Sequence, residues 1–121
     1  MELLASGLVA VVGLLHLWFL VLEMVLWQRP LGLRTFGLTP EFARESATLA
    51  ANQGLYNGFL AVGLLLTLVA PQPTAFHGQL FLLGCVIVAG VFGAATVSRR
   101  ILFVQALPAV LALLAVLAAA N

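Results

Sequence analysis

The sequence contains few charged residues: five basic and four acidic side chains, which make up 7% of its 121 positions. Soluble globular domains carry about 25% charged residues, so this composition excludes one. Cysteine is almost absent as well, because Cys85 is the only one. A single cysteine excludes an intrachain disulfide and a cysteine-based metal motif. The net charge of +1 is too small to indicate a nucleic-acid partner.

Hydrophobic residues, by contrast, make up 64% of the chain and give a mean hydropathy of +1.19. A bilayer is crossed by about 20 apolar residues in a helix, and three runs reach that length. The run over residues 46–70 is polar in its first half, but only a fourth crossing brings the arginines to one side. We therefore predict an all-α transmembrane up-and-down four-helix bundle, a single integral membrane domain over residues 1–121. Its helices are expected at about 3–27, 40–70, 74–97 and 101–120.

The arginines give the predicted orientation. They lie only in the loops after the first and third predicted helices or in the first turns of the helix that follows: Arg29, Arg34, Arg44, Arg99 and Arg100. The positive-inside rule places such loops in the cytoplasm, so both termini are expected outside, an N-out/C-out topology. We expect the bilayer to be a bacterial cytoplasmic (inner) membrane. The start Met1-Glu2 lacks the basic region of a signal peptide, so the first helix is expected to be retained.

Two short patterns give local detail. Residues 28–38 alternate arginine, glycine, proline and apolar side chains, which indicates a short segment in the membrane interface rather than a free loop. Thr39-Pro40-Glu41 is typical of a helix start, with Thr39 as N-cap, Pro40 in the first turn and an acid beside the positive helix end. Pro108 is expected to bend the last helix near Gln105.

His16 and Glu23 are the candidate acid/base or proton-relay pair. They are seven residues apart in the first apolar run, which puts them on one helix face to within about 20°. Ionisable groups inside a membrane segment are costly and usually functional. Amide and phenol side chains on two other helices are the candidate ligand-binding residues: Asn52, Gln53, Tyr56, Asn57 and Gln105.

A helical wheel places Asn52 and Tyr56 on one arc of the second long helix, with Gly54 and Gly58 on the opposite arc. We expect the polar arc to face the first helix and the glycines to pack elsewhere. With antiparallel helices, Glu23 is expected level with residues 51 and 52, and Gln105 at about the depth of Glu23. The sequence leaves open whether the small-residue contacts form within one chain or in a homo-oligomer.

These residues favour a site that binds a small apolar molecule from the bilayer, most readily for proton-linked transport. One alternative is a membrane-embedded acid–base enzyme, isomerase-like, acting on a lipid-soluble substrate. Another is a structural or accessory subunit whose polar groups only hold the helices in register. No cofactor is expected, and a metal is disfavoured because His16 and Glu23 are about 10.5 Å apart along the helix axis.

Four motifs carry a family resemblance: HLWFLVLEM at 16–24, FGLTPEF at 36–42, LAANQGLYNG at 49–58 and QALPA at 105–109. With them the chain resembles the small integral membrane proteins called domain of unknown function 1304. The resemblance covers nearly the whole sequence. It implies a four-helix membrane protein and no established activity.

Overall fold

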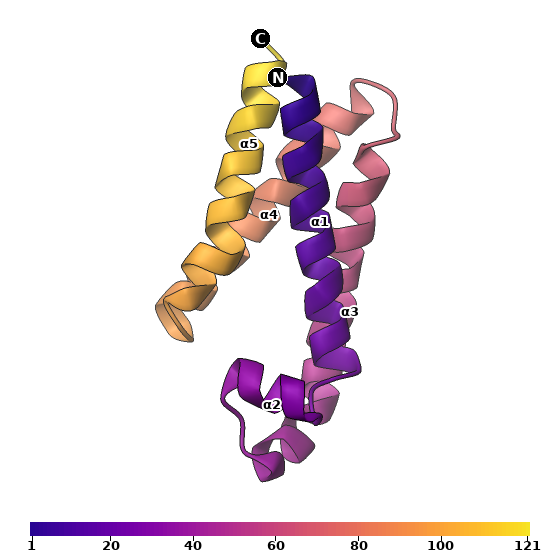
Figure 1. The fold of residues 1–121 in the computed structure, drawn as a ribbon. Coiled ribbons are helices and arrows are strands. Elements are labelled where there is room, and N and C mark those ends of the chain that lie inside the picture. Colours follow the sequence, from indigo (N-terminus) through magenta and orange to yellow (C-terminus); the bar gives the residue numbers. More distant parts are fainter.

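The chain folds into helices only, with no strands, as seen in a computed structural model that describes residues 1–121 (Figure 1). Four long helical segments are each long and apolar enough to cross a membrane. In chain order the elements are α1 (Glu2–Met24), α2 (Pro30–Phe36), α3 (Pro40–Thr67), α4 (Thr74–Thr96), the π-helix η1 (Leu102–Ala106) and α5 (Leu107–Ala119).

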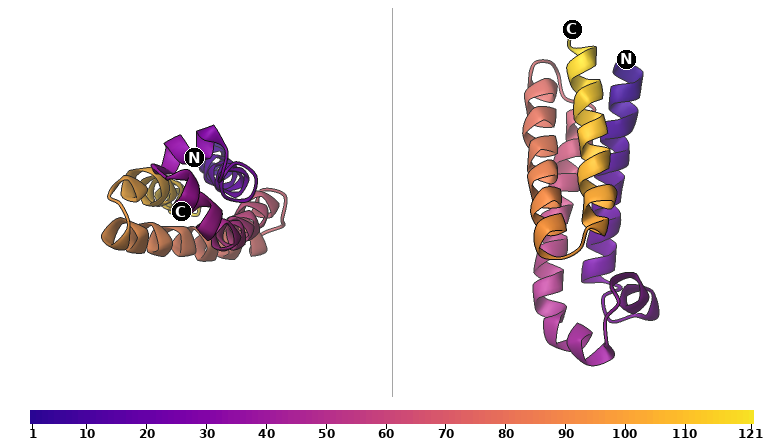
Figure 2. Two further views of the ribbon diagram at one scale, coloured as in Figure 1. Left: turned by 90° about the horizontal axis from the view of Figure 1, so that it is seen from below. Right: turned by 90° about the vertical axis from the view of Figure 1, so that its left-hand side faces the viewer.

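The long helices run up and down beside one another. α1 packs along α3 and α5, and α4 packs on α3, η1 and α5. Both termini lie at one end of the bundle, and the opposite end, called the α2 end from here on, carries α2 and the start of α3 (Figures 1 and 2). α3 has 28 residues and α4 only 23, so the turn between α4 and η1 stops short of the beginning of α3 (Figure 2).

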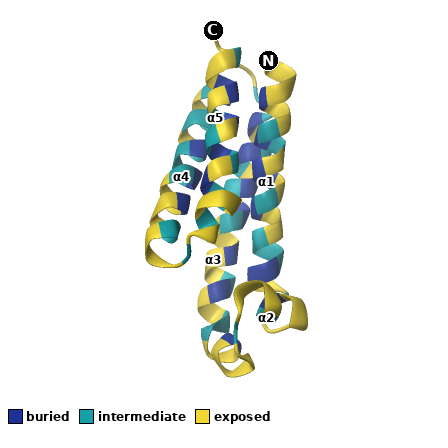
Figure 3. Cartoon of the chain, turned by 60° about the vertical axis from the view of Figure 1, so that its left-hand side comes forward, coloured by how far each residue is buried: buried dark blue, intermediate teal, exposed yellow.

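The core lies where the four long helices face one another, and the outer faces are exposed (Figure 3). Fully buried side chains from all four meet there, among them Val12, Leu64, Leu83 and Ala112. The outer faces are apolar too, as exposed Leu3, Val69 and many similar residues show. A soluble protein rarely exposes apolar surface on this scale, so the exterior suits a hydrocarbon solvent.

The segment after α1 forms a short helix, α2, rather than a free loop, in agreement with the prediction. Its last residue is followed by Gly37, whose φ of 64° gives the left-handed conformation that commonly ends helices. A Cβ atom at Gly32 would overlap the main-chain carbonyl of Leu26. α2 is therefore docked directly against the backbone that leaves α1.

α3 begins as predicted. Pro40 is in the first turn, and the Thr39 hydroxyl accepts a hydrogen bond from the Phe42 amide at 3.2 Å. α1, however, ends at Met24 instead of continuing to residue 27. At that point the Val25 and Leu26 amides both donate to the Val21 carbonyl. Beyond it the Trp27 indole N–H donates to the Ser46 hydroxyl at 3.0 Å, and the Trp27 ring packs on Phe36 of α2.

The last crossing is not one regular helix. Residues 102–106 form a π-helix, in which the Leu107 amide donates to the Leu102 carbonyl, and α5 follows. Pro108 lies in the first turn of α5, where its missing N–H costs little. The sequence predicts a bend near Pro108, and the structure has a widened turn there that contains Gln105.

Candidate functional site

His16 is buried inside the bundle, with 1% of its surface exposed. Its Nδ1 lies 2.9 Å from the Val12 carbonyl, four residues earlier in α1. A carbonyl only accepts hydrogen bonds, so Nδ1 carries the hydrogen and Nε2 of the neutral ring is an acceptor. The Gln105 side-chain amide, with its nitrogen 3.5 Å from Nε2, is placed to donate to it. His16 therefore links α1 to η1 through a long, weak hydrogen bond.

Glu23 lies in the last turn of α1 and is 5% exposed. The Asn57 side-chain amide of α3 donates to its Oε1. The Gln53 amide, one turn earlier in α3, lies beside the same carboxyl group. Both side-chain partners of Glu23 are thus neutral amides, and no arginine is among them. Glu23 links α1 to α3.

Two glycines let α1 and α3 approach closely at this point. A Cβ at Gly54 would lie 2.6 Å from the Met24 Cγ and 3.1 Å from the Glu23 Cβ, and one at Gly58 would lie 2.6 Å from the Leu20 Cδ1. The prediction that these glycines face away from α1 is therefore wrong. Close packing of the two backbones, which needs small residues, decides the rotation of α3. The amides reach α1 only from the flanks of the glycine contact.

That rotation separates the predicted ligand-binding residues. Asn57 and Gln53 lie beside Glu23, whereas Asn52 and Tyr56 are exposed on the far side of α3. The Tyr56 ring makes a T-shaped contact with Phe59 of the same helix, with 5.7 Å between ring centroids. Neither Asn52 nor Tyr56 hydrogen-bonds with the acid/base pair.

The predicted depths also need correction. Glu23 lies level with Gly54 and Asn57 rather than with residues 51 and 52. Gln105 contacts His16 rather than reaching the depth of Glu23, because the turn between α4 and η1 stops short of the beginning of α3 (Figure 2). The polar constellation is thus two contacts on one face of α1, about 10.5 Å apart along its axis.

One feature of the site was missed from the sequence: the π-helix around Gln105. π-helical turns are rare and frequently occur at functional sites. Pro108 was the only signal, since a proline in a helix interior removes a hydrogen bond and disturbs the preceding turn. It indicates an irregular turn without specifying a π-helix.

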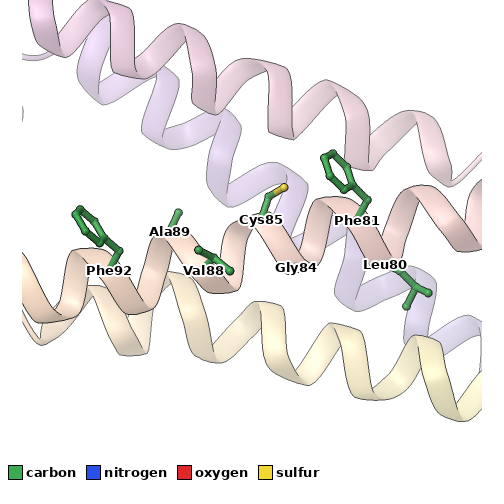
Figure 4. A pocket seen from close by; sticks show the side chains of 7 residues that line it. All are labelled: Leu80, Phe81, Gly84, Cys85, Val88, Ala89 and Phe92. Atoms are coloured by element: carbon green, nitrogen blue, oxygen red, sulfur yellow. The ribbon is translucent and has the colours of Figure 1, made fainter.

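Two apolar grooves open on the outer surface, and neither is lined by His16 or Glu23. The smaller, about 290 Å³, lies on α1 beside Trp18. The larger, about 770 Å³, follows the outer face of α4, where Gly84 leaves a gap between larger side chains (Figure 4). It is lined by Leu80, Phe81, Gly84, Cys85, Val88, Ala89 and Phe92.

No three His, Cys, Asp or Glu side chains converge to hold a metal ion. The ionisable pair can instead take up and release protons, and each change would alter a hydrogen bond between two helices. His77, the other histidine, is exposed near the start of α4 and far along the chain from this pair.

Comparison with known proteins gives one match. Residues 10–117 match the family described as "Protein of unknown function (DUF1304)". The chain finds no match among curated proteins or among solved structures. The matched region includes both contacts of the site and nearly all of the four long helical segments. The chain therefore belongs to the DUF1304 family of proteins of unknown function.

Proposed function

We propose that this is a four-crossing integral membrane protein of a bacterial inner membrane, with the α2 end in the cytoplasm and both termini outside. The support is the distribution of arginine. Arg29 and Arg34 flank or lie in α2, Arg44 is in the first turns of α3, and Arg99 and Arg100 lie in the turn before η1. All five belong to loops or helix ends at the α2 end, as the positive-inside rule requires of the cytoplasmic side.

Within this topology we propose that the protein binds a small apolar molecule between its helices, with binding linked to protonation, as in proton-linked transport. One observation carries this proposal: His16 and Glu23 of α1 are buried, and each contacts an amide on a different helix rather than an opposite charge. The Glu23 carboxylate held this way is costly in a membrane protein, because its charge has no opposite charge beside it. A proton is the simplest partner that removes this charge.

Protonation would change both helix contacts. A second proton on His16 turns Nε2 from acceptor to donor, so Gln105 must present its oxygen instead of its nitrogen. A proton on Glu23 removes the negative charge that strengthens the hydrogen bond from Asn57. Both changes act on α1, which would shift against α3 and η1 and open or close the space between them.

The proposal is tested by measuring the affinity of Nile red, an apolar fluorescent probe, for the protein in liposomes. An apolar molecule binds more favourably beside neutral Glu23 than beside its carboxylate. The wild type should therefore bind Nile red at least about 5-fold more tightly at pH 5 than at pH 8. Glu23→Gln, which resembles the protonated carboxyl, should bind tightly at both. Glu45→Gln removes an exposed carboxylate of the same helix bundle and should behave as the wild type. Equal pH dependence in the wild type and Glu23→Gln would refute the proposal.

The second candidate is a structural or accessory subunit, favoured by the fact that no buried polar side-chain atom lacks a partner. In that role the amides only hold the helices in register. Glu23→Gln would then leave the stability of the protein unchanged or raise it, with no pH-dependent probe binding in either form. An acid–base enzyme is less favoured, because a separation of about 10.5 Å keeps His16 and Glu23 from acting on one small reacting group.

A further inference from the structure

The outer face of α3 carries four exposed side chains at regular spacing: Leu49, Asn52, Tyr56 and Phe59. We call them the α3 stripe. Leu49 is 76% exposed and Tyr56 is 60% exposed, and nothing else in the chain packs over them. The steps between them are three, four and three residues, and Glu45 precedes Leu49 by four. Steps of three and four residues keep these side chains on one face of the helix, which is the spacing that two helices packed along each other use.

The same face of α3 is already a helix-packing face nearer the chain termini. Gly63, four residues beyond Phe59, lies against Leu82 of α4, and Thr67 lies against Gly78. α4 then runs away from α3 toward its turn with η1 (Figures 1 and 2). The α3 stripe is the continuation of this face on the side that α4 leaves uncovered.

We propose that the α3 stripe is the contact between two copies of this chain. Asn52 at its centre supports a second copy as the partner, because an amide both donates and accepts and so can pair with the same residue across a two-fold axis. Asparagine at one position of such a repeat is known to fix the register of two parallel helices. Copies inserted in one orientation present their stripes in parallel.

The position of the stripe adds to this argument. Asn52 lies half a turn from Gly54, which contacts the last turn of α1, so it is at the membrane boundary on the α2 side. α3 is about 42 Å long, more than a bilayer core needs. Its first turns extend past the core, where exposed Leu49 meets water unless a partner covers it. A helix face in contact with lipid alone would not need the Asn52 amide, and a face in contact with water alone would not need the apolar side chains of the stripe.

The test is disulfide cross-linking of the full chain in liposomes. In a Cys85→Ala background, Asn52→Cys should give a cross-linked dimer under mild oxidation. Val62→Cys is the control, since it is exposed on the same helix but lies about 100° around the helix axis from the middle of the stripe. The wild-type chain adds a third position, because Cys85 lines the groove on the outer face of α4. Equal cross-linking at Asn52 and Val62, or cross-linking at Cys85 alone, would overturn the proposal.

A second measurement separates contact from chance collision. Energy transfer between labelled copies should persist as the protein is diluted in lipid, and Asn52→Ala should weaken the dimer about 5-fold to 30-fold, given roughly 1–2 kcal/mol for an amide hydrogen bond between membrane helices. Helix content and the thermal stability of the monomer should not decrease, because Asn52 is exposed and alanine is the better helix former. A monomer at every dilution would also overturn the proposal. Neither result depends on proton-linked binding.

Discussion

Gly90 of α4 lies against the π-helix so closely that any side chain there must displace it. A Cβ at Gly90 would be 2.8 Å from both the Cβ and the backbone nitrogen of Ala106, and 3.0 Å from its Cα. Backbone atoms cannot rotate away as the end of a flexible side chain can. Gly84, in the same helix, has nothing within 4 Å of the corresponding position. The pair Gly90→Ala and Gly84→Ala therefore differs mainly in this contact.

The magnitude follows from two opposing effects. Either substitution raises helix propensity by up to about 1 kcal/mol, because alanine is the better helix former. Only Gly90→Ala also overpacks the interior, which typically costs about 1–3 kcal/mol. We expect the free energy of unfolding of Gly90→Ala to be lower than that of Gly84→Ala by about 1–3 kcal/mol. Because Gln105 adjoins Ala106, the shift of η1 should also break the 3.5 Å contact with His16.

Reversible unfolding in mixed detergent micelles, followed by circular dichroism, measures this difference. The wild type should lie between the two variants or level with Gly84→Ala. The nitrogen resonances of the His16 imidazole report whether Gln105 has moved, and they should change in Gly90→Ala only. If both variants unfold within about 0.5 kcal/mol of each other, the spread usual for uneventful substitutions, the close contact between α4 and η1 is refuted.

Two further predictions concern the α2 end. Thr39→Ala removes the oxygen that accepts from the Phe42 amide and should lower the free energy of unfolding by about 1 kcal/mol, whereas Thr39→Ser should restore it; full stability of the alanine variant would count against the cap. Trp27→Phe keeps a ring against Phe36 but loses the N–H that donates to Ser46, at an expected cost of about 0.5–1.5 kcal/mol. A double-mutant cycle with Ser46→Ala measures the coupling, and strict additivity would contradict the hydrogen bond.

The features that could be predicted from the sequence are those set by local chemistry. The helix start at Thr39-Pro40 depends on a hydroxyl and a ring within one turn, and it is present in the structure. The long apolar segments are set by hydropathy, which needs no knowledge of neighbours. The end of α1 differs from the prediction, and the residues just beyond it make a contact that local chemistry does not indicate, since Trp27 donates to Ser46, nineteen residues away.

The rotation of α3 could not be obtained in this way. A helical wheel fixes the angles between Asn52, Asn57 and Gly54, but it does not say which angle faces the neighbour. Two interactions compete there: hydrogen bonds from the amides to Glu23, and close packing of the two backbones at the glycines. In the structure the glycines of α3 face α1, and Asn57 donates to Glu23 from the side of that contact. Asn52 then has to point away from α1, onto the exposed face of α3.

The separation of the site into two contacts has a cause that is visible only in three dimensions. His16 and Glu23 share one face of α1, so a single neighbour could have met both. α3 accompanies α1 to its end, but the hairpin of α4 and η1 is shorter and stops near the level of His16 (Figure 2). His16 consequently meets η1, and Glu23 meets only α3. A proton on one group would act on the other through their charges, about 10.5 Å apart, or through a movement of α1, the helix that carries both. Motion of α1 is therefore the structural change that would couple both helix contacts in a proton-linked function.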